Sequence, residues 1–407
     1  MVKQNKKVPE LRFKGFTDDW EQRKLNSVTE RVIRKNKNLE SELPLTISAQ
    51  YGLIDQLEFF NKTVASRDVS GYYLVKNGEF AYNKSYSNGY PWGAIKRLDR
   101  YDKGVLSTLY ILFKPIDVDS DFLAKYYDTT NWYKEVSMRA AEGARNHGLL
   151  NIAPSDFFET QLIIPVDKNE QYKIGRLFIM LDSIISLHKR KLEKLKLIKQ
   201  AYLQVIFPEN GKSLPGLRFA GFNGDWKQQK LGDITQSYSG GTPTSGKSEY
   251  YGGSIPFIRS AEINKSSTEL YLTQEGLENS SAKMVEIGNI LYALYGAISG
   301  EVGISKINGA INQAILSITP NDGYVARFIM QWLRMQKQQI TDTYLQGGQG
   351  NLSGNLIKDL VLNVPCKDEQ IKVAKLFDRL DALISIQNNK IYVLQKLKQA
   401  YLQKMFI

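Results

Sequence analysis

The sequence repeats itself at long range, and this repeat constrains the fold more than any other feature. Residues 11–25 read LRFKGFTDDWEQRKL and residues 217–231 read LRFAGFNGDWKQQKL, with 10 of the 15 positions identical. Residues 191–207 and 390–406 form a second pair, with 9 identities in 17 positions. Chance would give about one match in each pair. The repeat therefore predicts a tandem duplication of one structural unit.

Composition narrows the class of protein and of partner. The chain has 407 residues and a formal net charge of +12, which favours a polyanionic partner over charge that serves solubility alone. The single cysteine, Cys366, excludes a disulfide framework and is typical of a reducing compartment. No apolar stretch is long enough for a signal peptide or a membrane span. We expect a cytoplasmic protein with no membrane partner.

Each half divides into a globular part and a long helix. Short apolar runs at 110–113 and 315–318 lead to prolines and predict strands, while 122–133 and 325–344 predict helices. The fold class is therefore α+β, with two mixed α/β domains, two long helices and a pseudo-two-fold internal repeat. The predicted boundaries are 1–168 for the first domain, 169–208 for its helix, 209–367 for the second domain and 368–407 for its helix.

The two long segments carry heptads of apolar residues, which predict a coiled coil. Because the second domain joins the end of one helix to the start of the other, we expect antiparallel pairing. One predicted core series is Ile174, Leu181, His188, Leu195 and Tyr202, matched by Val373, Leu380, Gln387, Leu394 and Tyr401. The predicted second series is Leu177, Ile184, Lys191, Ile198 and Val205, matched by Leu376, Leu383, Lys390, Leu397 and Lys404. The polar residues in mid-series are interpreted as a register device.

A phosphate-loop pattern occurs in the second half. Gly241-Thr-Pro-Thr-Ser-Gly-Lys-Ser248 satisfies G-x-x-x-x-G-K-[ST] and would suit an NTP-driven DNA-remodelling enzyme. The mechanism needs a helix directly after the loop, but Glu-Tyr-Tyr-Gly-Gly-Ser-Ile-Pro follows. Pro243 also removes one cradling N–H. A glycine-rich turn between strands is the favoured interpretation. The rival predicts that Lys247→Ala abolishes nucleotide binding.

Other catalytic chemistry finds little support in the sequence. Two histidines and one cysteine are too few for an ordinary zinc site, and no G-x-S-x-G elbow is present. We predict no catalytic, metal-ligating or cofactor-binding residue.

Polar, aromatic and basic residues gather in the predicted loops. Amide side chains can pair with adenine, arginine with guanine, and basic residues with phosphates. For any single residue, ordinary turn chemistry remains the alternative. The predicted DNA-binding residues are Tyr82, Asn83, Lys84, Tyr86, Asn88, Arg139, Arg145, His147, Ser239, Thr242, Thr244, Arg259, Tyr292, Tyr295, Gln346, Gln349 and Asn351.

The doubled order of motifs resembles the specificity subunit of type I restriction–modification systems. Each half opens with L-R-F-x-G-F-x-x-x-W, at Leu11–Trp20 and Leu217–Trp226. Each long helix opens with Glu-Gln and continues to Leu-Asp, at 170–182 and 369–381. The turn at 241–243 with Tyr250-Tyr251-Gly252-Gly253 also resembles a common form of target-recognition domain. The first domain lacks this turn, so loop contacts do not transfer between halves.

The resemblance implies the function of each part. Each globular domain would be a target-recognition domain that reads one half of a bipartite site in double-stranded DNA, and the chain would be non-catalytic. The paired helices would set the spacer and dock two adenine-N6 methyltransferase subunits through Leu177, Leu181, His188, Leu195, Tyr202 and their repeats Leu376, Leu380, Gln387, Leu394 and Tyr401. Restriction–motor subunits would complete the complex. S-adenosylmethionine, ATP and magnesium would belong to those partners. A coiled-coil scaffold that binds no DNA is the remaining alternative.

Overall fold

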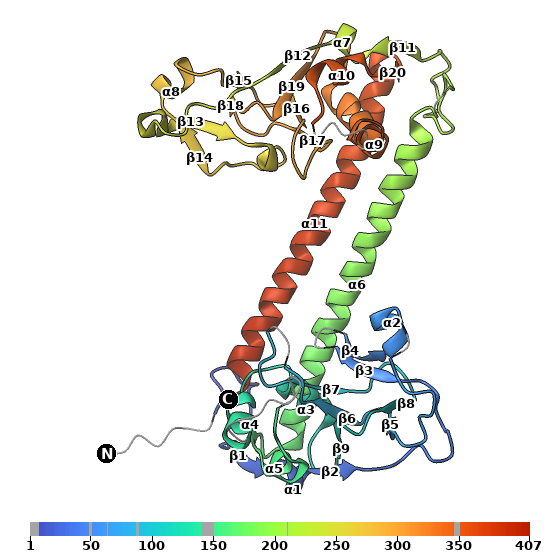
Figure 1. Cartoon of the computed structure of the whole chain (residues 1–407), viewed down its shortest axis with the longest axis vertical. Helices are drawn as coiled ribbons and strands as arrows, with labels where there is room; N and C mark the ends of the chain where they lie inside the picture. The colour runs from blue at the N-terminus through green and yellow to red at the C-terminus, as the bar shows by residue number, and fades with distance from the viewer. Residues whose placement is uncertain are drawn as a thin grey trace. The chain divides into compact units, whose positions relative to one another are not determined.

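The computed structural model describes residues 8–48, 51–62, 64–86, 89–140, 150–209, 211–345 and 351–407. The chain forms two compact units (Figure 1). Unit 1 contains Met1–Lys189 and Asn389–Ile407, and unit 2 contains Arg190–Asn388. These units divide the chain differently from the predicted boundaries, because each long helix contributes its two halves to different units. No helix among the described residues is long and apolar enough to cross a membrane.

Unit 1 is built on a four-stranded antiparallel sheet in the order β2-β9-β6-β7. Strand β1 pairs with β10, which brings the start of the domain beside its end. Two small strand pairs, β3-β4 and β5-β8, lie in the same unit. The elements are β1 (Glu21–Lys24), α1 (Leu25–Val28), β2 (Thr29–Val32), β3 (Leu45–Ser48), β4 (Gly52–Asp55), α2 (Gln56–Phe60), β5 (Tyr73–Lys76), β6 (Phe80–Asn83), β7 (Ala94–Arg97), β8 (Lys103–Leu106), β9 (Ile111–Pro115), α3 (Ser120–Tyr126), α4 (Tyr133–Arg139), α5 (Pro154–Phe158) and β10 (Gln161–Ile164).

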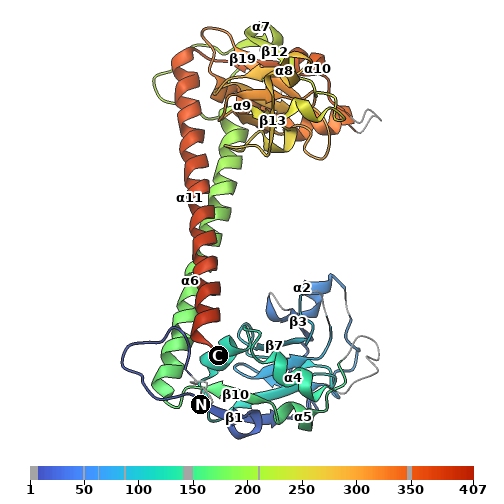
Figure 2. The same ribbon diagram turned by 90° about the vertical axis from the view of Figure 1, so that its left-hand side faces the viewer.

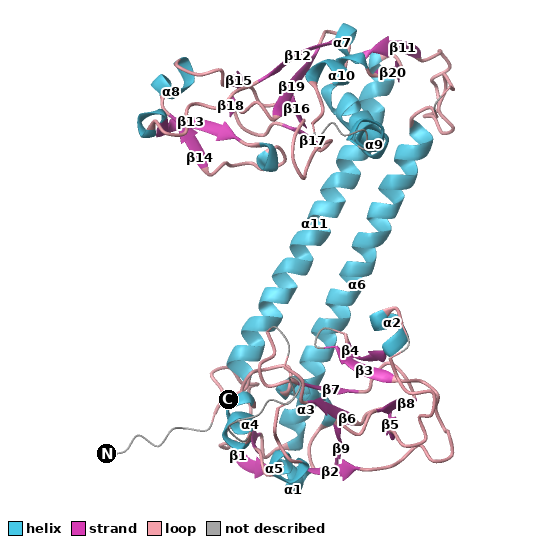
Figure 3. Ribbon diagram, in the orientation of Figure 1, coloured by secondary structure: helices cyan, strands magenta, loops and turns pink. Residues whose placement is uncertain are grey.

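Unit 2 repeats the main sheet and the strand pair that joins the start of the domain to its end; we call this shared arrangement, together with the long helices, the frame. Its main sheet has the equivalent order β12-β19-β16-β17, and β11 pairs with β20 as β1 does with β10. A second sheet, β14-β13-β18-β15, has no four-stranded equivalent among the described residues of unit 1 (Figure 3). The elements are β11 (Lys227–Lys230), α7 (Leu231–Ile234), β12 (Thr235–Ser239), η2 (Ser248–Tyr250), β13 (Tyr251–Ile258), η3 (Ser260–Glu262), β14 (Leu270–Leu272), α8 (Gln274–Glu278), β15 (Lys283–Val285), β16 (Ile290–Ala293), β17 (Val302–Ile304), β18 (Gly309–Ile311), β19 (Ile315–Pro320), α9 (Ala326–Leu345), α10 (Gly354–Asp359) and β20 (Val361–Val364).

The predicted strand at 315–318 lies within β19, and the predicted strand at 110–113 overlaps β9 from residue 111 onward. The predicted helix at 325–344 corresponds to α9, but a continuous helix at 122–133 is wrong. The chain there forms α3 and α4 with a break between them. Thr129 contributes to the break, since its hydroxyl donates to the carbonyl of Tyr126 and competes with helical bonding.

The long helices are α6 (Lys168–Ile206) and α11 (Lys367–Met405), of 39 residues each. They begin and end at positions 199 residues apart. In unit 1 the start of α6 lies beside the end of α11, since Asp182 contacts Lys398 (Figure 2). In unit 2 the end of α6 lies beside the start of α11, since Lys199 contacts Asp381. The pairing is therefore antiparallel, as predicted.

The seam between the helices differs from the prediction in its second series. Residues of low exposure recur at alternating steps of four and three, and the first predicted series belongs to them. The second series is wrong by one position, because Ile184, Ile198 and Leu383 are 39–44% exposed and Lys191 and Lys390 are also exposed. The true second series is Phe178, Ile185, Leu192, Lys199 and Ile206, repeated as Phe377, Ile384, Ile391, Lys398 and Met405.

The end of each helix completes the core of a globular domain. Phe406 packs against Phe122, Tyr126 and Phe178 in unit 1. Its repeat, Phe207, packs against Trp226, Phe328 and Phe377 in unit 2. The last residues of the chain therefore belong to the core of its first domain.

Candidate nucleic-acid interface

A buried carboxylate at the start of each long helix binds the entry segment of its unit, residues 11–16 or 217–222. Arg12 donates to both oxygens of Glu170, at 2.6 and 2.7 Å. Arg218 donates to both oxygens of Glu369, at 2.8 Å each. The glutamate side chains are 0% and 1% exposed. A bidentate guanidinium compensates such a buried charge, so this pair anchors each domain to its helix.

The glutamine that follows each of these glutamates, Gln171 or Gln370, binds the backbone of its domain at an equivalent residue. The Gln171 side-chain oxygen accepts from the backbone N–H of Asp119, at 2.8 Å. The Gln370 oxygen accepts from the N–H of Val325, at 2.9 Å. Asp119 is thus equivalent to Val325, with an offset of 206 residues. Each amide group also donates to the proline carbonyl just before its helix.

One aspartate in each unit joins three elements. Asp182 of α6 accepts from Lys398 of α11 at 2.6 Å and from Lys125 of α3 at 2.7 Å. Asp381 of α11 accepts from Lys199 of α6 at 2.6 Å and from Arg334 of α9 at 3.0 Å. The two helix lysines, Lys199 and Lys398, are residues of the seam between the helices. The aspartates therefore connect each domain to both helices.

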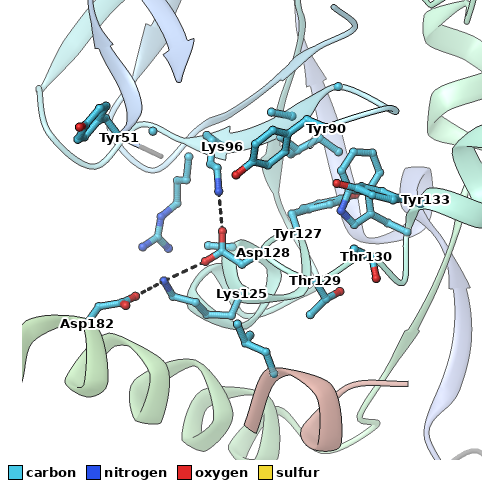
Figure 4. Close-up of a pocket in the computed structure, with 18 of the residues that line it drawn as sticks. Tyr51, Tyr90, Lys96, Lys125, Tyr127, Asp128, Thr129, Thr130, Tyr133 and Asp182 are labelled. Carbon is cyan, nitrogen blue, oxygen red and sulfur yellow. Dashed lines mark hydrogen bonds and ion pairs between the residues drawn. The ribbon is translucent and has the colours of Figure 1, made fainter. Parts of the chain in front are cut away.

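A cleft of about 700 Å³ opens beside Asp182 in unit 1, between β7 and the segment that joins α3 to α4; we name it cleft 1 (Figure 4). Lys96 binds Asp128 at 2.6 Å, and Lys125 binds Asp128 at 3.4 Å. Burial opposes the charged form of Asp128, but these ammonium groups outweigh it and hold its pKa below the ordinary value. Tyr90 and Tyr133 line one end. The charged centre of cleft 1 thus has aromatic and hydroxyl groups beside it.

A cleft of about 880 Å³ opens beside Asp381 in unit 2; we name it cleft 2. Arg327 binds Asp378 at 2.9 Å, and Arg334 also lines the cleft. Lys306 is exposed and donates to the backbone carbonyl of Asn264. Cleft 2 therefore presents three cations against two aspartates.

The two clefts occupy matching places but differ in the sign of the charge at two equivalent positions. Asp128 and Arg334 are equivalent at the offset of 206 and line clefts 1 and 2 respectively. Asp99 and Lys306 each lie two residues after their strand, β7 or β17, and also line the clefts. Two surfaces on one frame, with the charge reversed at these two positions, suit two different ligands.

The phosphate-loop pattern is a turn, as favoured from the sequence. It leads into η2, of three residues, and then into strand β13. A Cβ on Gly241 would lie 1.8 Å from the Ser281 hydroxyl oxygen, so the loop is packed closely. The Lys247 ammonium donates to the Tyr250 hydroxyl. No N–H cradle with a following helix forms here.

Comparison with known families identifies the frame. Residues 223–396 match the family described as the type I restriction modification DNA specificity domain. This segment of the chain is therefore a specificity domain of that family. The matched segment comprises the unit 2 domain and most of α11.

Curated relatives are similar to parts of this chain. It is 27% identical over 191 residues to the type I restriction enzyme MjaIX specificity subunit of Methanocaldococcus jannaschii, covering 45% of this chain and 44% of that one. It is 25% identical over 168 residues to the EcoR124I/EcoR124II specificity subunit of Escherichia coli, covering 39% and 41%. The chain thus spans less than half the length of these relatives.

Solved structures extend the likeness of fold to the whole chain. The crystal structure of a type I restriction–modification S subunit from M. genitalium matches with a TM-score of 0.64 at 16% identity, covering 98% of this chain and 99% of that one. A chain from a study of complex assembly of the type I system matches with a TM-score of 0.55 at 17% identity, covering 95% and 97%. The specificity-subunit fold therefore extends over both units.

Two of the predicted DNA-binding residues are core residues. Tyr82 and Tyr292 are 0% exposed, and burial raises the pKa of both hydroxyls. Their prediction as DNA contacts is wrong, because neither offers surface to a ligand. The Tyr82 hydroxyl donates to the carbonyl of Trp92, whereas that of Tyr292 has no partner among the described residues.

Three of the other unit 1 candidates, Asn83, Lys84 and Tyr86, lie at or just after the end of β6. Asn83 and Lys84 are half-buried, and burial lowers the pKa of Lys84. Tyr86 is 52% exposed. Arg139 binds Glu135 at 2.6 Å, within α4. The candidates outside the described residues are Asn88, Arg145 and His147.

The unit 2 candidates fall into two groups. Ser239, the last residue of β12, is half-buried, and Thr242 and Thr244 in the segment that follows are exposed. Tyr295 pairs with Asn351 by an isolated bridge. The candidates outside the described residues are Gln346 and Gln349. Their roles remain predictions.

Arg259 is held by two carboxylates. It binds Glu262 at 2.9 Å and Glu269 at 2.6 Å. Burial opposes the charged form of Glu262, but hydrogen bonds from Arg259 lower its pKa to about 2. The Arg259 charge is thus compensated within the unit.

Sequence reasoning missed the charged residues of the clefts, although a signal was present. Asp182 and Asp381, and likewise Lys199 and Lys398, recur at the helix offset of 199. A charge that persists in both copies beside an apolar seam indicates a specific partner. Among the described residues, no group of three acidic, histidine or cysteine side chains could hold a metal ion.

Proposed function

We propose that this chain is the DNA sequence-specificity subunit of a type I restriction–modification complex, in which each unit reads one half of a bipartite target. The observation that carries the proposal is the pair of matching clefts whose charged residues differ at equivalent positions of one repeated frame. Direct readout of different base pairs needs different donors and acceptors, whereas docking of identical partners needs the same frame twice.

The partner surfaces in this proposal are exposed flanks of the helices, which include residues that the sequence had placed in the second heptad series. In unit 1 these are Ile184 and Leu187 of α6 with Leu397 of α11, which are 38–58% exposed. In unit 2 the equivalents are Leu383 and Ile386 of α11 with Ile198 of α6, which are 43–49% exposed. Such exposed apolar patches are typical of protein–protein interfaces. Two equivalent patches suit two copies of one methyltransferase subunit, each docking an apolar helix.

The proposal also covers the catalytic role of the chain, its compartment and the cofactors of its partners. The chain itself would be non-catalytic and cytoplasmic. S-adenosylmethionine would be bound by the methyltransferase subunits, and ATP and magnesium by restriction–motor subunits. The paired helices would set the unread spacer between the half-sites.

The test of sequence specificity is methylation in cells. The chain is co-expressed with its cognate methyltransferase subunit, and methyladenine is mapped across the host genome. A bipartite motif with a fixed spacer is expected, and the control variant Lys247→Ala should leave it unchanged. A continuous motif, or methylation that does not depend on this chain, would contradict the proposal.

Docking is tested by counting the methyltransferase subunits bound to each variant of this chain. Leu187→Lys alters only the unit 1 patch, and Ile386→Lys alters only the unit 2 patch. Native mass spectrometry of each variant complex should show one methyltransferase copy instead of two. Tyr86→Lys, on an exposed residue outside both patches, is the matched control. Loss of both copies from either single variant would refute two independent docking sites.

A further inference from the structure

The middle of α6 is far more basic than its repeat in α11. Residues 189–199 contain six lysine or arginine residues and one carboxylate, Glu193. The equivalent residues 388–398 contain three lysines and no carboxylate. The frame does not need this excess, since both helices form the same seam.

Most of these cations are uncompensated. Within the described ranges, Lys189, Arg190, Lys191 and Lys194 pair with no carboxylate. Lys196 binds Glu193 at 2.9 Å, but Glu193 is 64% exposed, so water screens this pair. The segment therefore carries net positive charge that is available to a ligand.

Lys189 lies on the flank of the unit 1 helices on which cleft 1 opens, and Lys196 lies on the flank of the unit 2 helices on which cleft 2 opens. Each follows a seam residue by one position, as Asp182 follows Leu181 and Asp381 follows Leu380. Asp182 lines cleft 1 and Asp381 lines cleft 2. Since seven residues make two helical turns, Lys189 lies about 10.5 Å beyond Asp182 on the same face of α6.

The chemistry of this flank differs from that of the apolar flank. The corresponding positions of α11 are Asn388 and Gln395, each one residue after the seam. Lysine and amide side chains all offer N–H donors. Lys189, Lys196, Asn388 and Gln395 are neither acidic nor apolar. This flank is therefore suited to phosphate oxygens and unsuited to an apolar helix.

We propose that Lys189 and Lys196 contact phosphates of the spacer duplex between the two half-sites. This inference rests on the proposed function. Phosphate contacts carry no base information, so they would strengthen binding without restricting the spacer sequence. The clefts and their loops would read bases, while this flank of α6 would hold the unread DNA between them.

The test measures salt dependence with the complex of this chain and its cognate methyltransferase subunit. Binding of a duplex with the bipartite target is followed from 50 to 200 mM salt, for wild type and for Lys189→Gln/Lys196→Gln. Each lost phosphate contact lowers the slope of log K against log salt by about 0.9. Between 50 and 200 mM salt, the affinity of wild type should therefore fall by a factor about 12 times larger than the affinity of the double variant.

The matched control is Arg190→Gln/Lys396→Gln, which removes two cations that point away from the seam on the outer faces of α6 and α11. Its slope should equal that of wild type. A second duplex carries methylphosphonates, which are uncharged, in the spacer alone. This change should weaken binding by wild type but not by the Lys189/Lys196 variant.

The outcomes separate the two proposals. If wild type prefers the bipartite duplex but the Lys189/Lys196 variant keeps the full salt slope, the phosphate contacts are refuted and the proposed function stands. An equal loss of slope in the control variant also refutes them, because it shows a general charge effect. If wild type binds the bipartite duplex no better than an unrelated duplex, the proposed function fails.

Discussion

Phe406, which directly follows the last residue of α11, should control the stability of the first domain. Phe406 is 4% exposed, and its ring centroid lies 5.3 Å from that of Phe122 and 5.7 Å from that of Phe178. Phe406→Ala removes these contacts and leaves a cavity. Truncation of a buried phenylalanine costs about 3–5 kcal/mol. The unfolding equilibrium of unit 1 should therefore shift by about 100- to 5,000-fold.

Hydrogen exchange at increasing urea, resolved by mass spectrometry, measures this effect in the intact chain. Peptides from β6 and α3 should lose protection at lower urea in Phe406→Ala, whereas peptides from β16 and α9 should not. Phe207→Ala, at the repeat position, should give the reverse. The control Phe60→Ala alters a phenylalanine that is 41% exposed and should change little. Equal loss in both units, or a change below about 1 kcal/mol, would refute the assignment of the C-terminus to the unit 1 core.

Three further predictions concern the frame and the corrected residues. Arg218→Ala leaves Glu369 buried without its partner and should destabilise unit 2 by about 3–5 kcal/mol, measured by the same exchange experiment. Tyr82→Phe should cost about 1 kcal/mol in thermal unfolding because a hydrogen bond is lost, whereas Tyr292→Phe should be neutral; neither should change the methylation motif. The folded-state pKa of Glu262 is lowered to about 2, so its stabilising contribution is complete above the unfolded pKa near 4.5 and is lost as pH falls towards 2. Glu262→Gln should remove that part of the acid sensitivity of unit 2 in pH-dependent unfolding.

The repeat in the sequence was enough to predict the fold class and the antiparallel helices. The second seam series was misassigned because the flank beside the seam is as apolar as the seam itself. Ile184, Ile198 and Leu383 suggest burial by residue type, whereas Lys199 and Lys398 suggest exposure. Asp381 and Asp182 make the lysine positions acceptable, and those contacts join residues 182 and 216 positions apart. Periodicity within one helix cannot detect a partner supplied by the other.

The candidate interface was only partly predictable for a related reason. Tyr82 and Tyr292 stand next to polar loops in the sequence, but they are the last inward-facing residues of β6 and β16 and belong to the cores. The clefts are lined by residues from several elements, such as Lys96, Lys125 and Asp182. Their convergence depends on how the sheet packs on α3 and α6, which no local pattern reports.

The central claim is that the two units read different halves of one target on a shared frame. The most direct measurement is the methylome of a hybrid in which residues 30–150 are replaced by the corresponding segment of another family member, co-expressed with the cognate methyltransferase subunit. We predict that one half of the bipartite motif changes while the other half and the spacer length stay the same. A change in both halves, or in neither, would contradict the claim.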